Sequence, residues 1–233
     1  MNNKKIKLYL DGPSIEQIKE NHKIQIDGYT FNPSLFKKNG AKDYLEYSRK
    51  ILSECSNKPV SLEVFADDEE NMIKQAKILN NLGTNIYVKI PIVYTNGKST
   101  YNVIEVLSKE KIKLNITAIF LIEQIKEILP AIKDTSSILS IFAGRLYDSG
   151  IDAKEKMIEI NNFVHQNSSC LTLWASTRMA YDYIAANTIK TDIITMQIEH
   201  IKKLNLIGTS PLEYSINTVK QFYHDAQISG FKI

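Results

Sequence analysis

Asn85-Ile86-Tyr87-Val88-Lys89-Ile90-Pro91 is a short run of apolar, aromatic and β-branched residues that contains a single lysine. The run predicts a buried strand. A lysine in such a strand loses part of its hydration, and a desolvated amine gives up its proton more readily than one in water. The neutral amine can then attack a carbonyl carbon, as Schiff-base chemistry on a sugar requires. The alternative is that Lys89 extends from the strand end into water.

Outward from this run, short β-branched or apolar segments alternate with longer amphipathic stretches about eight times. Eight strand–helix units predict an α/β protein with a closed (β/α)8 TIM barrel, because parallel strands need a crossover between them. The predicted strands are Ile6–Leu10, Ile26–Thr30, Val60–Phe65, Ile86–Ile90, Leu114–Ile119, Ile138–Ala143, Cys170–Ala175 and Ile193–Met196. The predicted helices are Ser14–Asn21, Ala41–Cys55, Glu69–Leu82, Thr100–Ser108, Leu121–Ile132, Ala153–Gln166, Thr177–Asn187, Ile198–Lys203 and a further C-terminal helix at about residues 211–228.

An open, doubly wound sheet is the alternative fold for such an alternation. Its usual dinucleotide-binding turn, Gly-x-Gly-x-x-Gly, does not follow the first strand, where the sequence is Asp11-Gly12-Pro13-Ser14. The sequence also has no Walker loop, no His-Glu-x-x-His helix and no serine nucleophile elbow. These absences favour the closed barrel and exclude several common enzyme classes.

Composition limits the possible partners. The 233 residues, 43% of them hydrophobic, are enough for one substantial core, so residues 1–233 are expected to form a single domain. The net charge is only +3 and the lysines are scattered, which does not indicate nucleic acid binding. Cys55 and Cys170 lie far apart, without metal-ligand spacing, and are expected to be reduced thiols of a cytoplasmic protein without a metal site. No apolar run approaches the roughly 20 residues of a membrane span.

Polar residues follow or end seven consecutive predicted strands. In a parallel barrel these strand ends meet at one mouth, where reactive groups are expected, whereas buried strand positions are otherwise apolar. A single residue of this kind can be a satisfied polar group of the core, but the whole set indicates a site. Its members are Asp11, Thr30, Asn32, Glu63, Lys89, Asn115, Thr117, Ser140, Arg145, Ser176 and Arg178.

The order and spacing of several short strings match a known family. The strings are Leu10-Asp11, Gly28-Tyr29-Thr30-Phe31-Asn32-Pro33-Ser34-Leu35, Ser61-Leu62-Glu63-Val64, Val88-Lys89-Ile90-Pro91 with Gly97, Asn115-Ile116-Thr117 with Ile119-Phe120 and Gln124, Phe142-Ala143-Gly144-Arg145 with Asp148, and Ala175-Ser176-Thr177-Arg178. Across nearly its whole length the chain resembles the transaldolases. By length it is most similar to the short subgroup that also contains fructose 6-phosphate aldolase.

The resemblance implies an enzyme that uses no metal and no organic cofactor. Lys89 would form a Schiff base with the C2 carbonyl of a ketose phosphate, and Asp11 would act as general base and acid at the C4 hydroxyl. Glu63 and Thr117 would hold the water that leaves and returns. The substrate-binding residues implied are Thr30, Asn32, Asn115, Ser140 and Phe142 for the sugar, and Arg145, Ser176 and Arg178 for the phosphate. The alternative for the arginines is a surface salt bridge.

Two positions bear on the type of reaction. Glu63 and Phe142 resemble the transferases of the family, whereas fructose 6-phosphate aldolase has an amide and a tyrosine there. The resemblance therefore implies a transaldolase that moves a dihydroxyacetone unit between sugar phosphates of the pentose phosphate pathway. A lyase that releases free dihydroxyacetone is the alternative, and a specialised relative with another sugar substrate is also open. The physiological donor and acceptor stay undetermined.

Five residues depart from the family pattern close to the expected site. They are Phe31, Leu121, Ile141, Trp174 and Gln197. Trp174 is expected either to pack between barrel and helix or to narrow the mouth and change the preferred acceptor. Together these departures bear on substrate identity more than on the mechanism.

The C-terminal segment carries an apolar and aromatic stripe at helical spacing, which includes Ile216, Val219, Phe222 and Tyr223. Such a stripe has to be covered. The resemblance implies that a neighbouring subunit covers it, in a homo-oligomer that is a pentamer or decamer. The alternative is that this helix packs on its own barrel.

Overall fold

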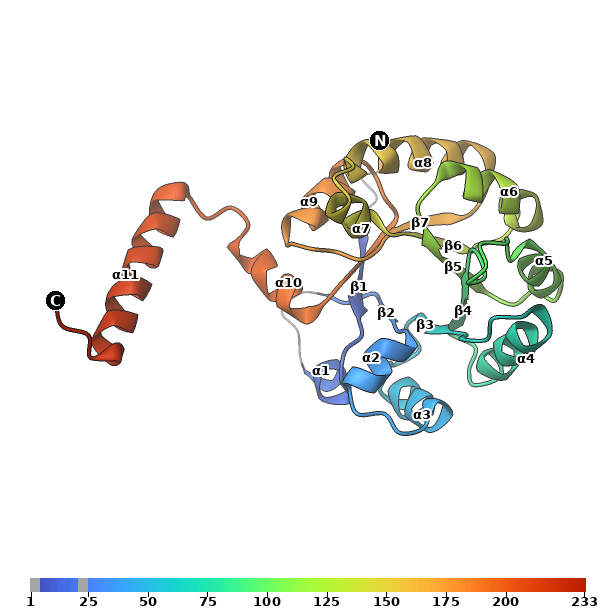
Figure 1. The fold of residues 1–233 in the computed structure, drawn as a ribbon, viewed down its shortest axis with the longest axis horizontal. Helices are drawn as coiled ribbons and strands as arrows, with labels where there is room; N and C mark the ends of the chain where they lie inside the picture. Colours follow the sequence, from blue (N-terminus) through green and yellow to red (C-terminus); the bar gives the residue numbers. More distant parts are fainter. Residues whose placement is uncertain (1–4, 21–24) are drawn as a thin grey trace.

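Eight parallel strands close into a barrel in the computed structural model, which describes residues 5–20 and 25–233 (Figure 1). The strands pair in sequence order, and β8 closes the ring on β1, with Lys7 opposite Ile193. Their bounds are β1 Lys7–Asp11, β2 Gly28–Thr30, β3 Val60–Glu63, β4 Ile86–Pro91, β5 Leu114–Ile119, β6 Ile138–Ile141, β7 Leu171–Trp174 and β8 Ile193–Met196. The predicted (β/α)8 barrel is confirmed.

Helices surround the barrel on the outside (Figure 1). Their bounds are α1 Ile15–Lys19, α2 Pro33–Lys38, α3 Tyr44–Glu54, α4 Glu69–Asn80, α5 Tyr101–Lys109, α6 Ile122–Ile132, α7 Ala143–Asp148, α8 Ala153–Asn167, α9 Tyr181–Thr188, α10 Ile198–Lys203 and α11 Pro211–Ser229, with a 3₁₀ turn at Leu204–Leu206. Asn21, the predicted end of the first helix, lies outside the described residues. None of the helices described is both long and apolar enough to cross a membrane.

Two short helices, α2 and α7, are absent from the sequence-based prediction. Each has six residues, which is short for a clear amphipathic period, although α10, of the same length, was predicted. α2 is defined by its start, where the Asn32 side chain accepts a hydrogen bond from the Leu35 amide and Pro33 occupies the first turn. α7 begins at Ala143, which was predicted to be the last residue of the sixth strand, whereas β6 ends at Ile141. α9 begins at Tyr181, four residues later than predicted, because residues 177–180 form a loop at the barrel mouth.

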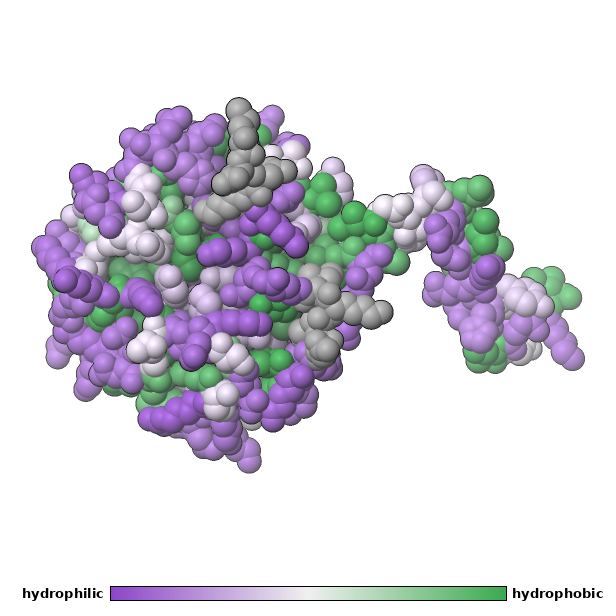
Figure 2. All heavy atoms as spheres, turned by 180° about the vertical axis from the view of Figure 1, so that it is seen from behind, coloured by the Kyte–Doolittle hydropathy of each residue, from purple (hydrophilic) through white to green (hydrophobic). Residues whose placement is uncertain are grey.

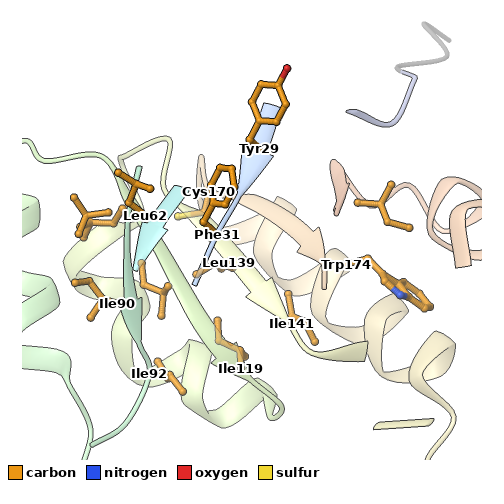
Figure 3. Packing of buried hydrophobic residues seen from close by; sticks show 14 of the residues in the cluster. Tyr29, Phe31, Leu62, Ile90, Ile92, Ile119, Leu139, Ile141, Cys170 and Trp174 are labelled. Carbon is orange, nitrogen blue, oxygen red and sulfur yellow. The ribbon is translucent and has the colours of Figure 1, made fainter. Parts of the chain in front are cut away.

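Alternation along the strands divides the buried residues into two sets. Side chains at odd and even strand positions face opposite sides of a sheet. One set, which includes Leu62, Ile90 and Ile141, packs between the barrel and its helices (Figure 3). A smaller, separate cluster consists of Tyr9, Ile138, Leu173, Ala175 and Ile193. Tyr9 shares the face of β1 that carries Asp11, so this cluster fills the barrel interior beneath the mouth.

Three of the family departures lie in the outer layer. Trp174 is fully buried (Figure 3). Its ring centroid lies 6.1 Å from that of Tyr147 on α7. Phe31 packs edge-on against Phe36 of α2 at 5.2 Å, and Ile141 is buried in the same layer. The interpretation that Trp174 narrows the mouth is therefore wrong, because the position faces away from the barrel interior. Leu121 is exposed, just before α6.

The C-terminal helix α11 projects away from the barrel (Figure 1). None of its residues is buried, and its apolar side chains form a large part of its surface (Figure 2). The alternative in which this helix covers its own barrel is therefore wrong. Its start is well specified, since the Ser210 side chain accepts a hydrogen bond from the Glu213 amide and Pro211 follows.

Candidate active site

The barrel mouth contains a cavity of about 160 Å³ with mostly polar walls. Its lining residues are Asp11, Thr30, Asn32, Leu35, Lys89, Thr117, Ser140, Phe142, Arg145, Ala175, Ser176, Thr177, Arg178, Thr195 and Gln197. Every predicted site residue except Glu63 and Asn115 is in this set. Those two lie immediately behind it and contact residues that line it. The structure thus brings the predicted strand-end residues together around one cavity.

Lys89 is buried in β4, with 6% of its surface exposed. Its Nζ atom donates a hydrogen bond to Glu63 Oε2 at 2.7 Å and another to the Phe31 carbonyl oxygen at 3.2 Å. Lys89 and Glu63 are register partners on neighbouring strands, so the barrel itself sets this ion pair. The alternative in which Lys89 extends into water is wrong, because the side chain follows the inward-facing positions of its strand and ends at the cavity.

Tyr44 on α3 holds the strand beside Lys89 in place. Its hydroxyl donates to the Glu63 carbonyl oxygen at 2.9 Å and accepts from the Glu63 amide at 3.1 Å. Such a pair of bonds fixes the end of β3, where a strand would otherwise begin to diverge from its neighbours. Sequence reasoning missed Tyr44, since nothing in the pattern of a helix shows that its side chain reaches a strand end.

Asp11 ends β1 beside the same cavity. Thr30 Oγ1 donates to Asp11 Oδ1 at 2.7 Å, and Thr30 is the register partner of Asp11 on β2. Burial raises the pKa of the Asp11 carboxyl above its ordinary value, and the Glu63 charge adds to this, whereas the Thr30 hydrogen bond and Lys89 oppose it. A carboxyl with a raised pKa holds a proton more readily than an ordinary one, which suits a group that both accepts and returns a proton.

Asn115 lies directly behind the cavity wall and is fully buried. Its amide nitrogen donates to Ser61 Oγ at 3.0 Å, and its amide oxygen accepts from Ser140 Oγ at 2.6 Å. Asn115 is also the register partner of Lys89 on β5. The residue therefore orients Ser140, which does line the cavity, while it contacts the barrel positions next to the lysine.

Thr117 is the clearest polar group without a partner at this end of the barrel. Only 1% of its surface is exposed, and its hydroxyl makes no hydrogen bond among the described residues. A register shift between Ile116 and Ile119 interrupts the β5–β6 pairing here, and Ala118 has a φ of 60°. Irregularities of this kind re-aim a side chain. A buried, unpaired hydroxyl at a polar cavity is a group that a substrate or water can satisfy.

The two arginines follow β6 and β7, Arg145 in helix α7 and Arg178 in the loop before α9. The Arg145 guanidinium lies over the Phe142 ring, 5.0 Å from its centroid. Arg178 forms an ion pair with Asp148, and Arg178 Nε lies 3.1 Å from Asp148 Oδ1. The salt-bridge alternative is thus present for Arg178, although the side chain also lines the cavity. Both partners are well exposed, and exposed pairs of this kind contribute little stability, so an anionic ligand can compete for Arg178.

Ser176 has a φ of 61°, an unusual conformation for a residue with a side chain. Two features surround this residue, one in the loop that follows it and one on α7. The Asp182 carboxylate accepts hydrogen bonds from the Arg178 and Met179 amides, at 2.7 and 3.2 Å. On the other side, Gly144 of α7 approaches so closely that a Cβ atom there would lie 1.6 Å from the Ser176 carbonyl oxygen. Strained backbone at a cavity wall indicates a functional constraint.

Thr195 and Gln197 line the cavity but were not predicted as site residues. Both lie on the inward-facing positions of β8 and its extension, next to Asp11 on one side and Ser176 on the other. The alternation of β8 could have revealed them, because it places every second residue toward the mouth. Of the five family departures, only Gln197 lines this cavity.

The described residues offer no other obvious chemistry. They contain no group of three or more His, Cys, Asp or Glu side chains that could hold a metal ion. Cys55 and Cys170 are both buried and unpaired, and burial raises the pKa of the Cys55 thiol to about 12. A thiol of that kind is a packing residue and a poor nucleophile.

Comparisons with solved structures show the fold alone. The chain is similar to a thiamine phosphate pyrophosphorylase from Pyrococcus furiosus, with a TM-score of 0.56 and 10% identity over 84% of this chain and 87% of the other. It is also similar to 2,3-dimethylmalate lyase, with a TM-score of 0.59 and 11% identity over 98% and 95% of the two chains. Both likenesses agree with the barrel described above.

Sequence comparisons are more specific. A "Probable transaldolase" from Methanococcus maripaludis is 36% identical over 201 residues, which cover 85% of this chain and 89% of that protein. One from Thermoanaerobacter sp. is 33% identical over 235 residues, 97% of this chain and 95% of that protein. The model of the transaldolase/fructose-6-phosphate aldolase family matches residues 8–232. With the lysine, carboxylates and arginines placed around one barrel mouth, the chain belongs to the transaldolase/fructose-6-phosphate aldolase family.

Proposed function

We propose that this protein is a transaldolase, which transfers a dihydroxyacetone unit from a ketose phosphate to an aldose phosphate through a Schiff base on Lys89. The observation that carries the proposal is the buried Lys89 amine, which lies 2.7 Å from a carboxylate and borders a polar cavity at the barrel mouth. The names of the relatives support the same activity for the family.

The Lys89–Glu63 contact supplies the first proton transfer. Lys89 has to lose a proton before its nitrogen can attack the C2 carbonyl, and Glu63 Oε2 already accepts a hydrogen bond from it. The carbinolamine then loses water to give a protonated imine. Glu63 and the unpartnered hydroxyl of Thr117 are the groups that would hold that water and return it at hydrolysis.

Asp11 is placed for the bond-breaking step. As its carboxylate takes the proton of the C4 hydroxyl, the bond between C3 and C4 breaks, and its electron pair moves into the imine to form an enamine. The aldehyde product leaves. In the transfer direction the enamine attacks the incoming aldehyde, and Asp11 returns the proton to the new hydroxyl. The raised pKa of Asp11 suits a group that works in both directions.

Binding follows from the other cavity walls. The Asn32 amide oxygen is used to cap α2, so its NH₂ group is the part that can donate to a sugar hydroxyl. Ser140, oriented by Asn115, supplies a second polar contact. Arg145, Arg178 and Ser176 would bind the phosphate at the opposite side, since guanidinium groups match phosphate oxygens in geometry and charge.

The alternative is a lyase of the fructose 6-phosphate aldolase type, because the family contains both activities. Glu63, a carboxylate in contact with Lys89, and Phe142, an aromatic ring without a hydroxyl at the cavity wall, favour the transferase. The test is release of glyceraldehyde 3-phosphate from fructose 6-phosphate, followed with a coupled dehydrogenase, with and without erythrose 4-phosphate. Release that depends on the acceptor supports transfer, and equal release without it would show a lyase. Glu63→Gln combined with Phe142→Tyr is expected to raise acceptor-independent release.

The proposal includes an assembly and a place in metabolism. The exposed apolar side chains of α11 support a homo-oligomer in which this helix is covered by a neighbouring subunit, as a pentamer or decamer. Sugar phosphates that exchange dihydroxyacetone units are intermediates of the pentose phosphate pathway, which would place the protein in the cytoplasm.

A further inference from the structure

Asp11 is the end of a chain of three side chains that crosses three neighbouring strands. Thr195 of β8 and Thr30 of β2 approach each other from the two sides of β1, with 2.5 Å between their Oγ1 atoms. Thr30 Oγ1 in turn lies 2.7 Å from Asp11 Oδ1. Thr30 and Thr195 are both largely buried, although each borders the cavity.

Hydrogen counting fixes the direction of this chain. A threonine hydroxyl has one hydrogen to donate, and a carboxylate can only accept. When Asp11 is ionised, the hydrogen of Thr30 is therefore used on Asp11. Thr195 must then be the donor of the short hydrogen bond between the two threonines, and Thr30 is its acceptor. Hydrogen bonds in such a row strengthen one another, because each donor is polarised by the bond that it accepts.

We propose that Thr195 is a positioning residue for the proton-transfer step, which holds the Thr30 hydroxyl so that its hydrogen points at Asp11 and keeps the carboxylate oriented toward the cavity. The proposal deepens the proposed function, on which it rests for its effect on turnover. No step of the mechanism above uses Thr195.

Loss of the Thr195 hydroxyl has a defined consequence. Without that donor, the Thr30 oxygen has an unsatisfied lone pair in a buried place, and its hydroxyl is free to turn away from Asp11. The Thr30 hydrogen bond is one of the interactions that oppose the raised pKa of Asp11. If that bond weakens, the pKa of Asp11 rises further, and its carboxylate is less well aimed at the C4 hydroxyl.

The test uses the full-length protein and three variants. Thr195→Val removes the hydroxyl with little change of shape, Thr195→Ser keeps it, and Thr195→Ala is a second way to remove it if the valine variant does not fold. The titration of Asp11 is followed by ¹³C NMR of aspartate-labelled protein without substrate, with Asp11→Asn to assign the signal. Steady-state kinetics with fructose 6-phosphate and erythrose 4-phosphate are measured across pH.

Other charged groups near Asp11 are unchanged in all the variants. They are Lys89 and Glu63 on neighbouring strands, Arg145 and Arg178 around the same cavity, and Lys38 and Glu199 around an adjoining cavity that Asp11 also borders. A shift that appears on removal of the hydroxyl and disappears in Thr195→Ser therefore belongs to the threonine chain.

We expect the Asp11 titration to move to higher pH in Thr195→Val, and to stay close to the wild-type position in Thr195→Ser. Likewise, kcat of Thr195→Val should fall about tenfold with KM nearly unchanged, and the acidic limb of its pH profile should move upward. An unmoved Asp11 titration, or a rise in KM with unchanged kcat, would overturn the proposal, the latter by showing that Thr195 contacts substrate. Failure of the proposed function would appear instead as absent turnover in the wild type, while the Asp11 titration still decides the role of Thr195.

Discussion

The surroundings of Asp11 and Asp67 shift the pKa values of these two aspartates in opposite directions. Burial raises the pKa of Asp11, whereas hydrogen bonds from Thr95 lower the pKa of the exposed Asp67. A carboxyl whose pKa is raised by folding favours the folded state when protonated and loses that contribution as the pH rises through its folded pKa. A carboxyl whose pKa is lowered does the reverse.

Asp11→Asn is therefore expected to raise the thermal midpoint at pH 7, although it removes the proposed proton-transfer group and activity with it. The gain should shrink as the pH falls, because Asp11 of the wild type then becomes neutral as well. Thermal unfolding of both proteins between pH 4, close to the ordinary pKa of an aspartate, and pH 8 measures the difference between their midpoints. Asp67→Asn is the matched control and should lower the midpoint at pH 7. An unchanged or lower midpoint for Asp11→Asn would contradict the account.

Gln197 is a second residue whose role can be tested directly. It borders the cavity between Asp11 and Ser176, the residue of the proposed phosphate site on β7's side. In the proposed reaction, the hydroxyl next to the aldehyde of the acceptor would lie close to Gln197. We expect Gln197→Ala to lower kcat/KM for erythrose 4-phosphate by roughly threefold to tenfold, the effect of one hydrogen bond.

The measurement compares acceptors with and without that hydroxyl. The loss in Gln197→Ala should be confined to acceptors that carry it, while 2-deoxy analogues are unaffected. Gln25→Ala, which changes an exposed glutamine before β2 at the far end of the barrel, is the control and should leave all acceptors alike. An equal loss for every acceptor would exclude a specific contact.

At the scale of elements, the close approach of α7 to the loop after β7 builds the proposed phosphate site. Gly144→Ala would force its Cβ against the Ser176 carbonyl oxygen, and that backbone cannot move without loss of the Ser176 conformation. We expect destabilisation of about 1–3 kcal/mol, as for overpacked positions, together with a higher KM for phosphorylated substrates. Denaturant unfolding and kinetics measure the two effects.

Gly150→Ala is the control for Gly144→Ala. Gly150 has a φ of 78° and open space around the position of a Cβ, so this variant carries backbone strain without a clash and without contact to the cavity. It should lower stability modestly and leave KM unchanged. If Gly144→Ala changed KM no more than Gly150→Ala, the close approach would have no role in binding.

The sequence predicted the long elements and, among the short helices, α1 and α10, whereas it missed α2 and α7 for a physical reason. Strands such as Ile86–Pro91 and helices such as Glu69–Asn80 show their own period, because each buries one or both faces over several turns or residues. α2 begins at a local cap, Asn32 followed by Pro33, but is too short to show a period, whereas α7 has no side-chain cap and lies against the loop after β7. Most of the site could be predicted because strand ends in a barrel converge. Thr195 could have been found from the alternation along β8, whereas the role of Tyr44 depends on which side chains meet in space.

At the scale of the whole molecule, the projecting helix α11 is the feature that needs a partner. Its exposed side chains include Leu212, Phe222 and Tyr223, and none of its residues is buried. We expect the full-length protein to have a solution mass well above its chain mass of 26.6 kDa. Removal of residues 209–233 should give a folded monomer, because the barrel buries nothing against this helix.

Size-exclusion chromatography with light scattering gives the masses, and circular dichroism shows whether the shortened chain is folded. Lys220→Ala is the matched control, since it changes a charged residue of α11 and leaves the apolar side chains in place. It should keep the wild-type mass. A full-length monomer, or a shortened chain that still assembles, would contradict the proposed role of α11.

Lys89 is the residue on which the proposed covalent intermediate forms. Incubation with fructose 6-phosphate and sodium borohydride reduces such an imine to a stable amine, which intact-mass measurement and peptide mapping locate. The account predicts a mass increase equal to one reduced dihydroxyacetone unit, on the peptide that contains Lys89, and none in a folded Lys89→Ala variant. The absence of an adduct on the wild type, or an adduct on another lysine that persists in Lys89→Ala, would contradict it.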